Sequence, residues 1–333
     1  MKVLIFGATG YVGNRLVRHL AEENHDVSGF ARNLENVATL AEMGCAVVTG
    51  DMSDLTSIPS LIEGIDAVVM AAQLPLDEEY QFVSALLDAM QGTDRCFILT
   101  SGTSLMSIRT DGDWDERNYA EDERFVPRRQ IAARLDTERL VRDAAGRGVR
   151  AMVVRPPLIW GHGGCQIISE FYHSARTTGQ VCHIGRGLNV YSNVHVDDLA
   201  TLYRLCLEKG VAGALYFAVS GEVSYGVMAR AIAETLEVGT RSVTIAEGID
   251  IWGKGLAGIV LCACSRQRSP RSREELGWAP SEDHLDILEE CRNPAYAAIS
   301  ERPIAAWMKQ GFGGRQHSDH PAGEDRGEAE RSS

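Results

Sequence analysis

The first fifteen residues constrain the fold of this chain more than any other stretch. An apolar, β-prone run at residues 3–6 meets the glycine-rich segment GATGYVG at residues 7–13, and apolar residues then recur at helical spacing. In this G-x-x-G-x-x-G pattern, Gly7 allows a tight turn, Gly10 lets the backbone approach a phosphate, and Gly13 lets the helix pack closely on the strand. Because the amides at the start of a helix suit a pyrophosphate, the segment predicts dinucleotide binding.

Strand and helix patterns alternate through the first half of the chain. Short β-prone runs are separated by stretches in which apolar residues recur at helical spacing. The pattern predicts strands at 26–31, 46–49, 67–72, 96–100 and 149–154, and helices at 34–42, 79–90 and 127–145. This order predicts an α/β fold with a Rossmann-type, doubly wound parallel sheet whose ligands lie along the carboxyl ends of the strands.

The residue at the end of the second predicted strand favours NADP as the cofactor. An NAD-selective protein places an acid there to hold the ribose hydroxyls, whereas this chain has Arg32, which can pair with a 2′-phosphate. NAD stays open as the alternative, with Arg32 then only capping a loop in solvent. Asp51, after the third strand, is placed to bind the adenine amino group, or else it forms a turn or a helix N-cap.

The composition of the chain limits the kinds of molecule that we expect it to bind. The net charge of −13 offers nothing to a nucleic acid or an anionic membrane, so we expect neither as a partner and instead a small-molecule substrate. No apolar run reaches the ~18–20 residues of a membrane span. The eight cysteines are scattered without zinc-ligand spacing, which predicts reduced thiols in a cytoplasmic protein that holds no metal.

Several further motifs make the chain resemble the extended and atypical short-chain dehydrogenases/reductases, the NAD-dependent epimerase/dehydratase group. They cover roughly residues 1–290 and are, beside the glycine segment, GD at 50–51, TSGT at 100–103, RPPLIWG at 155–161, VHVDDLA at 194–200 and LGWAP at 276–280. The resemblance implies a nucleotide-binding domain over 1–157, completed by 194–222, and a smaller substrate-binding lobe over 158–193 and 223–310. The polar tail at 311–333 is predicted to be disordered, His317 and His320 there being solvated rather than metal ligands.

The same resemblance exposes a break in the family's catalytic pattern. The family uses a Tyr-x-x-x-Lys helix, in which the tyrosine exchanges a proton with the substrate oxygen and the lysine holds the nicotinamide ribose. Here Gln130 and Arg134 occupy those positions. Arg134 can donate to ribose hydroxyls but cannot give up its proton near neutral pH. Gln130 can orient a carbonyl but has no titratable group.

Another group must therefore handle the proton. The candidates are Ser101, Thr103 and Ser104 after the fifth strand, Tyr119 in a polar loop at 105–126 that is predicted to cover the site, and Tyr191 or His195. His195 is more simply interpreted as a structural anchor, and Tyr172 and His173 either line the substrate pocket or pack. Carried over from the family, the predicted cofactor contacts are Gly7, Thr9, Gly10, Tyr11, Val12, Gly13, Arg32, Asp51, Met52, Ala71, Ala72, Arg134, Arg155 and Pro156.

The sequence leaves three functions open. The first is an NADP(H)-dependent oxidoreductase or epimerase-type enzyme acting on a small organic carbonyl or alcohol with a non-standard proton donor, its catalytic set being Ser101, Thr103, Tyr119, Gln130 and Arg134. The second is a non-redox lyase, isomerase or cyclase on the same fold. The third is a nucleotide-sensing protein without turnover. The helix at 127–145 resembles the one through which relatives pair, which predicts a homodimer.

Overall fold

A seven-stranded parallel sheet forms the larger of two lobes. The computed structural model describes residues 1–298, and the predicted disordered tail, with His317 and His320, lies outside them. The strand order β11-β7-β5-β4-β1-β2-β3 steps outward in both directions from β1, so the predicted α/β fold with a doubly wound sheet is confirmed. The strands are β1 (Lys2–Phe6), β2 (Asp26–Ala31), β3 (Ala46–Thr49), β4 (Ala67–Met70), β5 (Cys96–Thr100), β7 (Arg150–Arg155) and β11 (Leu215–Phe217).

Alternation along each strand divides the apolar side chains between two helical layers. In β1, Val3 and Ile5 face one layer, whereas Leu4 and Phe6 face the other. The first layer is formed by α1 (Tyr11–Glu22), α2 (Leu34–Glu42) and α7 (Val196–Lys209). The second is formed by α3 (Ile58–Leu61), α4 (Leu76–Met90) and α5 (Arg134–Asp143). Because both faces are covered, the carboxyl edge of the sheet is where a ligand can reach it.

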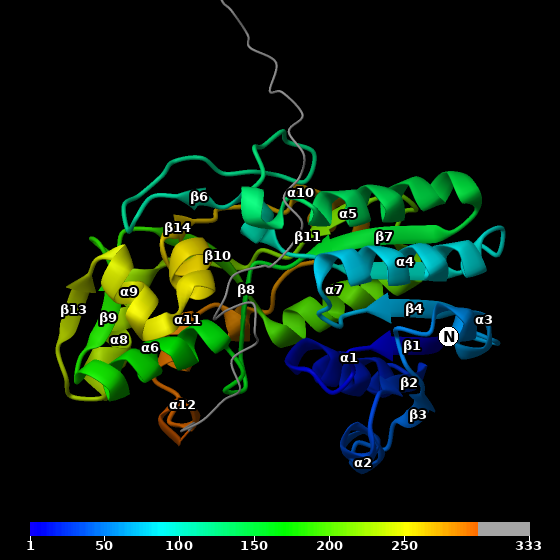
Figure 1. The fold of residues 1–333 in the computed structure, drawn as a ribbon, viewed down its shortest axis with the longest axis horizontal. Helices are drawn as coiled ribbons and strands as arrows, with labels where there is room; N and C mark the ends of the chain where they lie inside the picture. The colour runs from blue at the N-terminus through cyan, green and yellow to red at the C-terminus, as the bar shows by residue number, and fades with distance from the viewer. Residues whose placement is uncertain (299–333) are drawn as a thin grey trace, which may run out of the picture.

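Figure 1 shows a second lobe beside the large sheet, and this lobe has its own apolar core. A three-stranded sheet is formed by β8 (Leu158–Trp160), β10 (Val190–His195) and β12 (Gly221–Ser224), and a two-stranded sheet by β9 (Val181–Ile184) and β13 (Thr240–Val243). Around them lie α6 (Gln166–Thr178), α8 (Tyr225–Thr235), α9 (Ile245–Trp252), a π-helical turn at Leu256–Leu261, α11 (Ile287–Cys291) and α12 (Ala295–Ala298).

The chain returns to the large lobe inside the stretch assigned to the substrate lobe. After β14 (Ala263–Cys264), helix α10 (Pro270–Leu276) packs against α7 and β11. Leu276 and Trp278 are buried in the core of the α1–α7 layer, and the Trp278 indole donates to the Asp198 carbonyl at 2.8 Å. Within the stretch 223–310, these two apolar side chains therefore belong to the core of the large lobe.

The long helix predicted over 127–145 is wrong in its first turns. A 3-10 turn at Arg129–Ile131 comes first, α5 begins only at Arg134, and a second 3-10 turn follows at Ala144–Arg147. Arg128 is extended, with φ −61° and ψ 120°, because its backbone N–H donates to the Leu105 carbonyl at 3.0 Å. This tertiary hydrogen bond outweighs the local helical pattern.

The polar segment predicted as a covering loop is fastened to the second lobe. We call residues 107–128 the strap. Its strand β6 (Ile108–Arg109) pairs antiparallel with β14, and Tyr119 forms a parallel bridge with Gln267. Ion pairs join Glu123 to Arg268 and Asp122 to Arg271. The strap is thus an ordered link between the lobes.

Candidate active site

The glycine segment has a backbone geometry that only glycine permits. Gly7 has a φ of +85°, and a Cβ there would lie 2.6 Å from the backbone nitrogen of Ala72. A Cβ on Gly13 would lie 2.1 Å from the Gly7 carbonyl oxygen. The Gly10 N–H donates to the same oxygen at 2.9 Å, closing the turn. The end of β1, the start of α1 and the end of β4 are therefore in direct contact.

The first turn of α1 is left open for an anion. Gly10 is the N-cap residue and supplies no side-chain cap, and the first turn holds no acid. Gly10 is exposed, and Thr9, Tyr11 and Val12 are half-buried around it. Backbone N–H groups at a helix start, together with the positive end of the helix dipole, are what a pyrophosphate requires, so these residues fit the predicted dinucleotide. Ala71 and Ala72, whose backbone Gly7 touches, border the same turn.

Two exposed side chains mark the adenosine end of this predicted site. Arg32 lies at the end of β2 and Asp51 follows β3. One Asp51 oxygen accepts the Ser53 N–H at 2.9 Å, so the turn that the sequence left as an alternative is present. Hydrogen bonds from Ser53 lower the pKa of Asp51, and the charge of Arg32 adds to this effect. Met52, also predicted to contact the cofactor, is buried.

Two buried hydroxyl groups lie at the carboxyl end of β5. Ser101 is 8% exposed and Thr103 1% exposed, and neither hydroxyl oxygen has a hydrogen-bond partner among the described residues. The Thr103 N–H donates to the Pro156 carbonyl at 3.2 Å, and the Ser265 hydroxyl donates to the Thr103 carbonyl at 3.2 Å. Buried hydroxyls are normally paired, and these two, without a partner among the described residues, lie where both lobes meet.

Arg134, at the family's lysine position, is held by a buried acid on α4. Its Nη2 lies 2.7 Å from Oε2 of Glu79, which is 1% exposed. Burial raises the pKa of Glu79, the Arg134 charge opposes this rise, and Glu138 adds to it. The Arg134 side chain remains 17% exposed. The ion pair with Glu79 therefore fixes the position of the Arg134 guanidinium, and its predicted role in place of the lysine stays a prediction.

Arg155, predicted as a cofactor contact, lies inside the large lobe. Its Nε donates to Glu138 Oε1 at 2.8 Å and its Nη2 contacts the other carboxylate oxygen. The guanidinium lies over the rings of Phe125 and Phe217, at 5.3 and 5.7 Å from their centroids. With only 3% of Arg155 exposed, its visible role is to join β7 to α5.

The other predicted catalytic side chains are spread more widely. Gln130 is exposed in the 3-10 turn before α5. Tyr119 is half-buried in the strap, its ring 6.2 Å from that of Phe125. Tyr191 is 4% exposed, and burial raises its pKa to about 12, with a hydrogen bond from Ser265 opposing the rise. A tyrosine in that state is a hydrogen-bond donor rather than an acid near neutral pH.

His195 acts as the structural anchor that the sequence favoured. Its Nδ1 accepts the Asp197 N–H at 3.2 Å and so caps α7. Ligand atoms of His162, His195 and Asp197 lie within 4.8 Å of one another. Asp197, however, is already paired with Arg15, and the His195 Nδ1 lone pair is used by the cap. We therefore assign this group to packing between α1 and α7.

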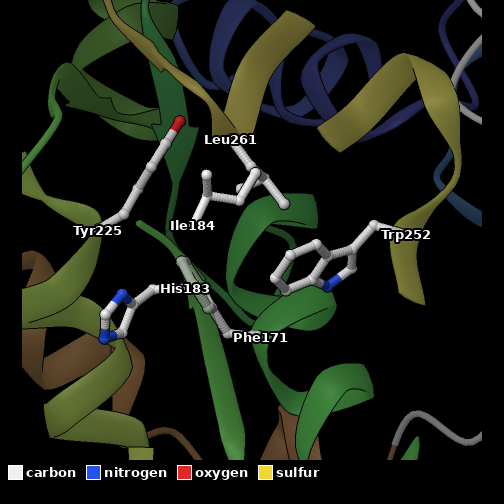
Figure 2. A pocket seen from close by; sticks show the side chains of 6 residues that line it. All are labelled: Phe171, His183, Ile184, Tyr225, Trp252 and Leu261. Carbon is white, nitrogen blue, oxygen red and sulfur yellow. The ribbon is translucent and has the colours of Figure 1, made fainter. Parts of the chain in front are cut away.

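Tyr172 is packed inside the second lobe, and His173 follows it on α6. Tyr172 is 1% exposed, stacks on Tyr296, and donates to the Cys291 carbonyl at 2.8 Å, so packing explains it. A gap of about 140 Å³ that is too narrow to admit a water molecule lies beside the same helix, and Figure 2 shows the side chains around it. Its walls are largely apolar and are formed by Phe171, His183, Ile184, Tyr225, Trp252 and Leu261. This gap is a packing imperfection of the second lobe.

Glu79 and Glu138 are the site residues that sequence reasoning missed. Glu79 lies three residues after Leu76 and three before Phe82, and Glu138 lies three before Val141, so each lies on the buried stripe of its helix. An acid on an apolar stripe was a visible signal that each needs a buried arginine. Its partner could not be read from the sequence, because Arg134 and Glu79 are 55 positions apart.

Comparison with known proteins identifies the family of this chain. A sequence model of the NAD dependent epimerase/dehydratase family matches residues 3–218. The chain belongs to this family. The predicted resemblance is thereby confirmed, and the chain is an NAD(P)-dependent enzyme of the oxidoreductase or epimerase type, with a nicotinamide dinucleotide as its class of cofactor. No described helix is both long and apolar enough to cross a bilayer.

The chain is similar to proteins of several kinds. It is 28% identical over 306 residues to an uncharacterized protein of Schizosaccharomyces pombe, covering 89% of this chain and all of that one. It is 27% identical to the 2-alkyl-3-oxoalkanoate reductase of Stenotrophomonas maltophilia, covering 67% and 71% of the two chains. The crystal structure of dTDP-glucose 4,6-dehydratase from Bacillus anthracis with NAD shares the fold, with a TM-score of 0.72, 16% identity and coverage of 90% and 97%.

Proposed function

We propose that this protein is an NADP(H)-dependent reductase of a small organic carbonyl. The observation that carries the proposal is the pair of buried, unpartnered hydroxyls of Ser101 and Thr103 at the edge of the sheet where the glycine segment also lies. A similar protein is named as a reductase of a 3-oxoalkanoate, which supports a carbonyl substrate. Arg32 and the lack of an acid at the end of β2 support NADP.

The chain's own residues divide the work as follows. The glycine segment and the open first turn of α1 hold the pyrophosphate, and Arg134, fixed by Glu79, presents its charge to the nicotinamide ribose. A bound reduced nicotinamide supplies a hydride to the carbonyl carbon. Ser101 and Thr103 donate hydrogen bonds to the carbonyl oxygen, and water replaces the proton delivered through them. Because the usual tyrosine is absent, we expect turnover slower by ~10²–10⁴ than with a dedicated acid.

Cofactor binding without turnover is the second candidate. Gln130 at the tyrosine position is the observation that favours it, because glutamine cannot exchange a proton. In that case the ordered strap and the Arg134–Glu79 pair stabilise one bound conformation. The two functions differ in whether the nicotinamide is consumed.

Oxidation of NADPH in the presence of short 3-oxo acids and ketones distinguishes these candidates. We expect slow loss of NADPH absorbance, a weaker effect with NADH, retention of activity in Thr103→Ser, and a fall of about tenfold or more in Thr103→Ala, because only alanine removes the hydrogen bond. Ser107→Ala, which alters a serine that bonds only to Ser104, is the control. Calorimetric binding of NADPH with no consumption of it would favour the second candidate, and no heat with either nucleotide would reject both.

A further inference from the structure

We infer that the substrate of this site carries a carboxylate and that Arg128 binds it where the strap meets the second lobe. This inference rests on the proposed carbonyl reductase and names its class of substrate. It begins with a local reversal of charge. Between Glu123 and Asp136 the chain has four arginines and no acid, in a protein whose net charge is −13. The reversal lies immediately before α5, at the edge of the predicted site.

Arg128 is held rigidly at the junction of the lobes. Its backbone N–H donates to the Leu105 carbonyl at 3.0 Å, just after the hydroxyl-bearing end of β5. Its Nη2 donates to the Gly258 carbonyl at 2.8 Å, in the π-helical turn of the second lobe. The side chain therefore crosses from the strap to the second lobe and is half-buried there. A guanidinium fixed at both ends loses little freedom when it binds a ligand.

The charge of Arg128 is not compensated. Within the described residues no carboxylate oxygen lies within 4.0 Å of it, whereas Arg134 and Arg155 each pair with a buried glutamate. Arg150 also lacks a carboxylate, but its guanidinium donates to three carbonyls at the end of α7, where the helix dipole is negative. Arg128 has one carbonyl as its acceptor, together with a hydrogen bond to the Cys262 thiol. Holding a charge out of water without a counter-ion costs free energy, and an anionic ligand would offset that cost.

The surroundings of Arg128 connect it to the proposed carbonyl position. Its charge acts on the Tyr191 hydroxyl and on the Cys262 thiol, and in both cases it opposes the rise in pKa that burial causes. Tyr191 forms a strand bridge with Ser265, and the Ser265 hydroxyl donates to the Thr103 carbonyl. These contacts connect Tyr191 with Thr103. An arginine fork matches the two oxygens of a carboxylate. One ligand with a carbonyl and a carboxylate thus accounts for both the unpartnered hydroxyls and the unpaired charge.

Matched acids and esters test this inference. Isothermal calorimetry of the full chain is run with 3-oxobutanoate, 4-oxopentanoate and 3-oxodecanoate and with the methyl ester of each, with and without saturating NADP⁺. We expect at least one acid to bind about tenfold or more tightly than its ester, and this preference to weaken as salt rises. Arg128→Gln should abolish the difference between acid and ester, Arg128→Lys should keep part of it, and Arg139→Gln, on an exposed arginine of α5, should leave it unchanged.

The acid-to-ester ratio separates binding from a general loosening of the junction. A variant that merely disturbs the contact with Gly258 would weaken acid and ester alike, and that result would overturn the inference. Equal affinity for acid and ester in the unaltered chain, or no heat with any acid, would also overturn it. Calorimetry of NADP⁺ binding under the same conditions distinguishes this inference from the proposed function. If the nucleotide binds and the acids do not, only this inference fails. If the nucleotide does not bind, the proposed function is rejected.

Discussion

At several positions of this site a side chain, a titratable group or, among the described residues, a hydrogen-bond partner is absent. Gly7 and Gly13 have no side chain where the backbone of another segment lies within 2.6 and 2.1 Å of a would-be Cβ. Ser101 and Thr103 have hydroxyls without partners among the described residues. Gln130 has no titratable group. The two glycines therefore let backbone segments approach closely, and the two hydroxyls have unused hydrogen-bonding capacity.

Substitution of Gly13 should separate the role of the glycine segment from general stability. In Gly13→Ala the new methyl would overlap the Gly7 carbonyl, so we expect a loss of about 1–3 kcal/mol in the free energy of unfolding and a fall of about tenfold or more in NADP⁺ affinity. Gly146→Ala is the matched control, because nothing lies within 4 Å of a Cβ there. Urea unfolding and calorimetry measure both quantities, and wild-type affinity in Gly13→Ala would contradict the assignment.

At the scale of elements, the glutamate–arginine pairs hold α4 and α5 in place. Glu79 on α4 binds Arg134 at the start of α5, and Glu138 on α5 binds Arg155 at the end of β7. A protein loses more stability when one partner of a buried ion pair is replaced than when both are replaced, because a single buried charge is then left without compensation. The pairs therefore fix where α5 lies, and with it the position of Arg134.

Unfolding measurements on α5 variants test this account. Glu138→Gln should lower the free energy of unfolding by ~3–5 kcal/mol, since Arg155 is left buried without its counter-ion. The double variant Glu138→Met with Arg155→Met should lose less. Asp136→Asn breaks an exposed pair with Arg139 on the same helix and should change stability by about 0.5 kcal/mol or less. A Glu138→Gln protein as stable as Asp136→Asn would show that the buried pair contributes little.

The success of sequence reasoning differed between elements for physical reasons. Strands β1, β2, β3 and β5 are short β-prone runs bounded by turn residues, so local pattern suffices to place them, and β2, β3 and β5 have the predicted bounds. The start of α5 was misplaced because a hydrogen bond to the Leu105 carbonyl holds Arg128 extended and a 3-10 turn at Arg129–Ile131 follows it. The pairing of Arg155 with Glu138 could not be predicted from the sequence, because it forms only when β7 packs against α5. The individual contacts predicted for the cofactor stay predictions.

At the scale of the whole molecule, the start of α7 is joined to the segment around residues 281–284. His195, which caps α7, stacks on His284 with ring centroids 3.9 Å apart, and Asp198 accepts the Ser281 N–H at 3.0 Å. The stack lies beside the contacts that bring the C-terminal segment back onto the large lobe. The predicted homodimer and cytoplasmic location, by contrast, concern surroundings of the chain and stay predictions.

This stack should make the protein sensitive to acid. Burial lowers the pKa of His195 from 6.5 to about 4, the His284 charge adding to the shift and Asp197 opposing it. As the pH falls from 6.5 to about 4, His195 takes up a proton in the unfolded chain but not in the folded one. The free energy of unfolding therefore decreases over this range. His195→Asn keeps a capping side chain without the titration. Its melting temperature should fall by a few degrees less on acidification than that of the wild type, whereas His173→Asn should follow the wild type.

The repeated crossing of the chain between lobes restricts how this protein can be divided. Residues 1–157 lack β11, α7, Leu276 and Trp278, which close one edge and one face of the large sheet. Neither half is therefore a module that can be produced separately or exchanged with that of a relative. Evolution of a new substrate preference has to proceed within the existing connections, by changing side chains where the strands end.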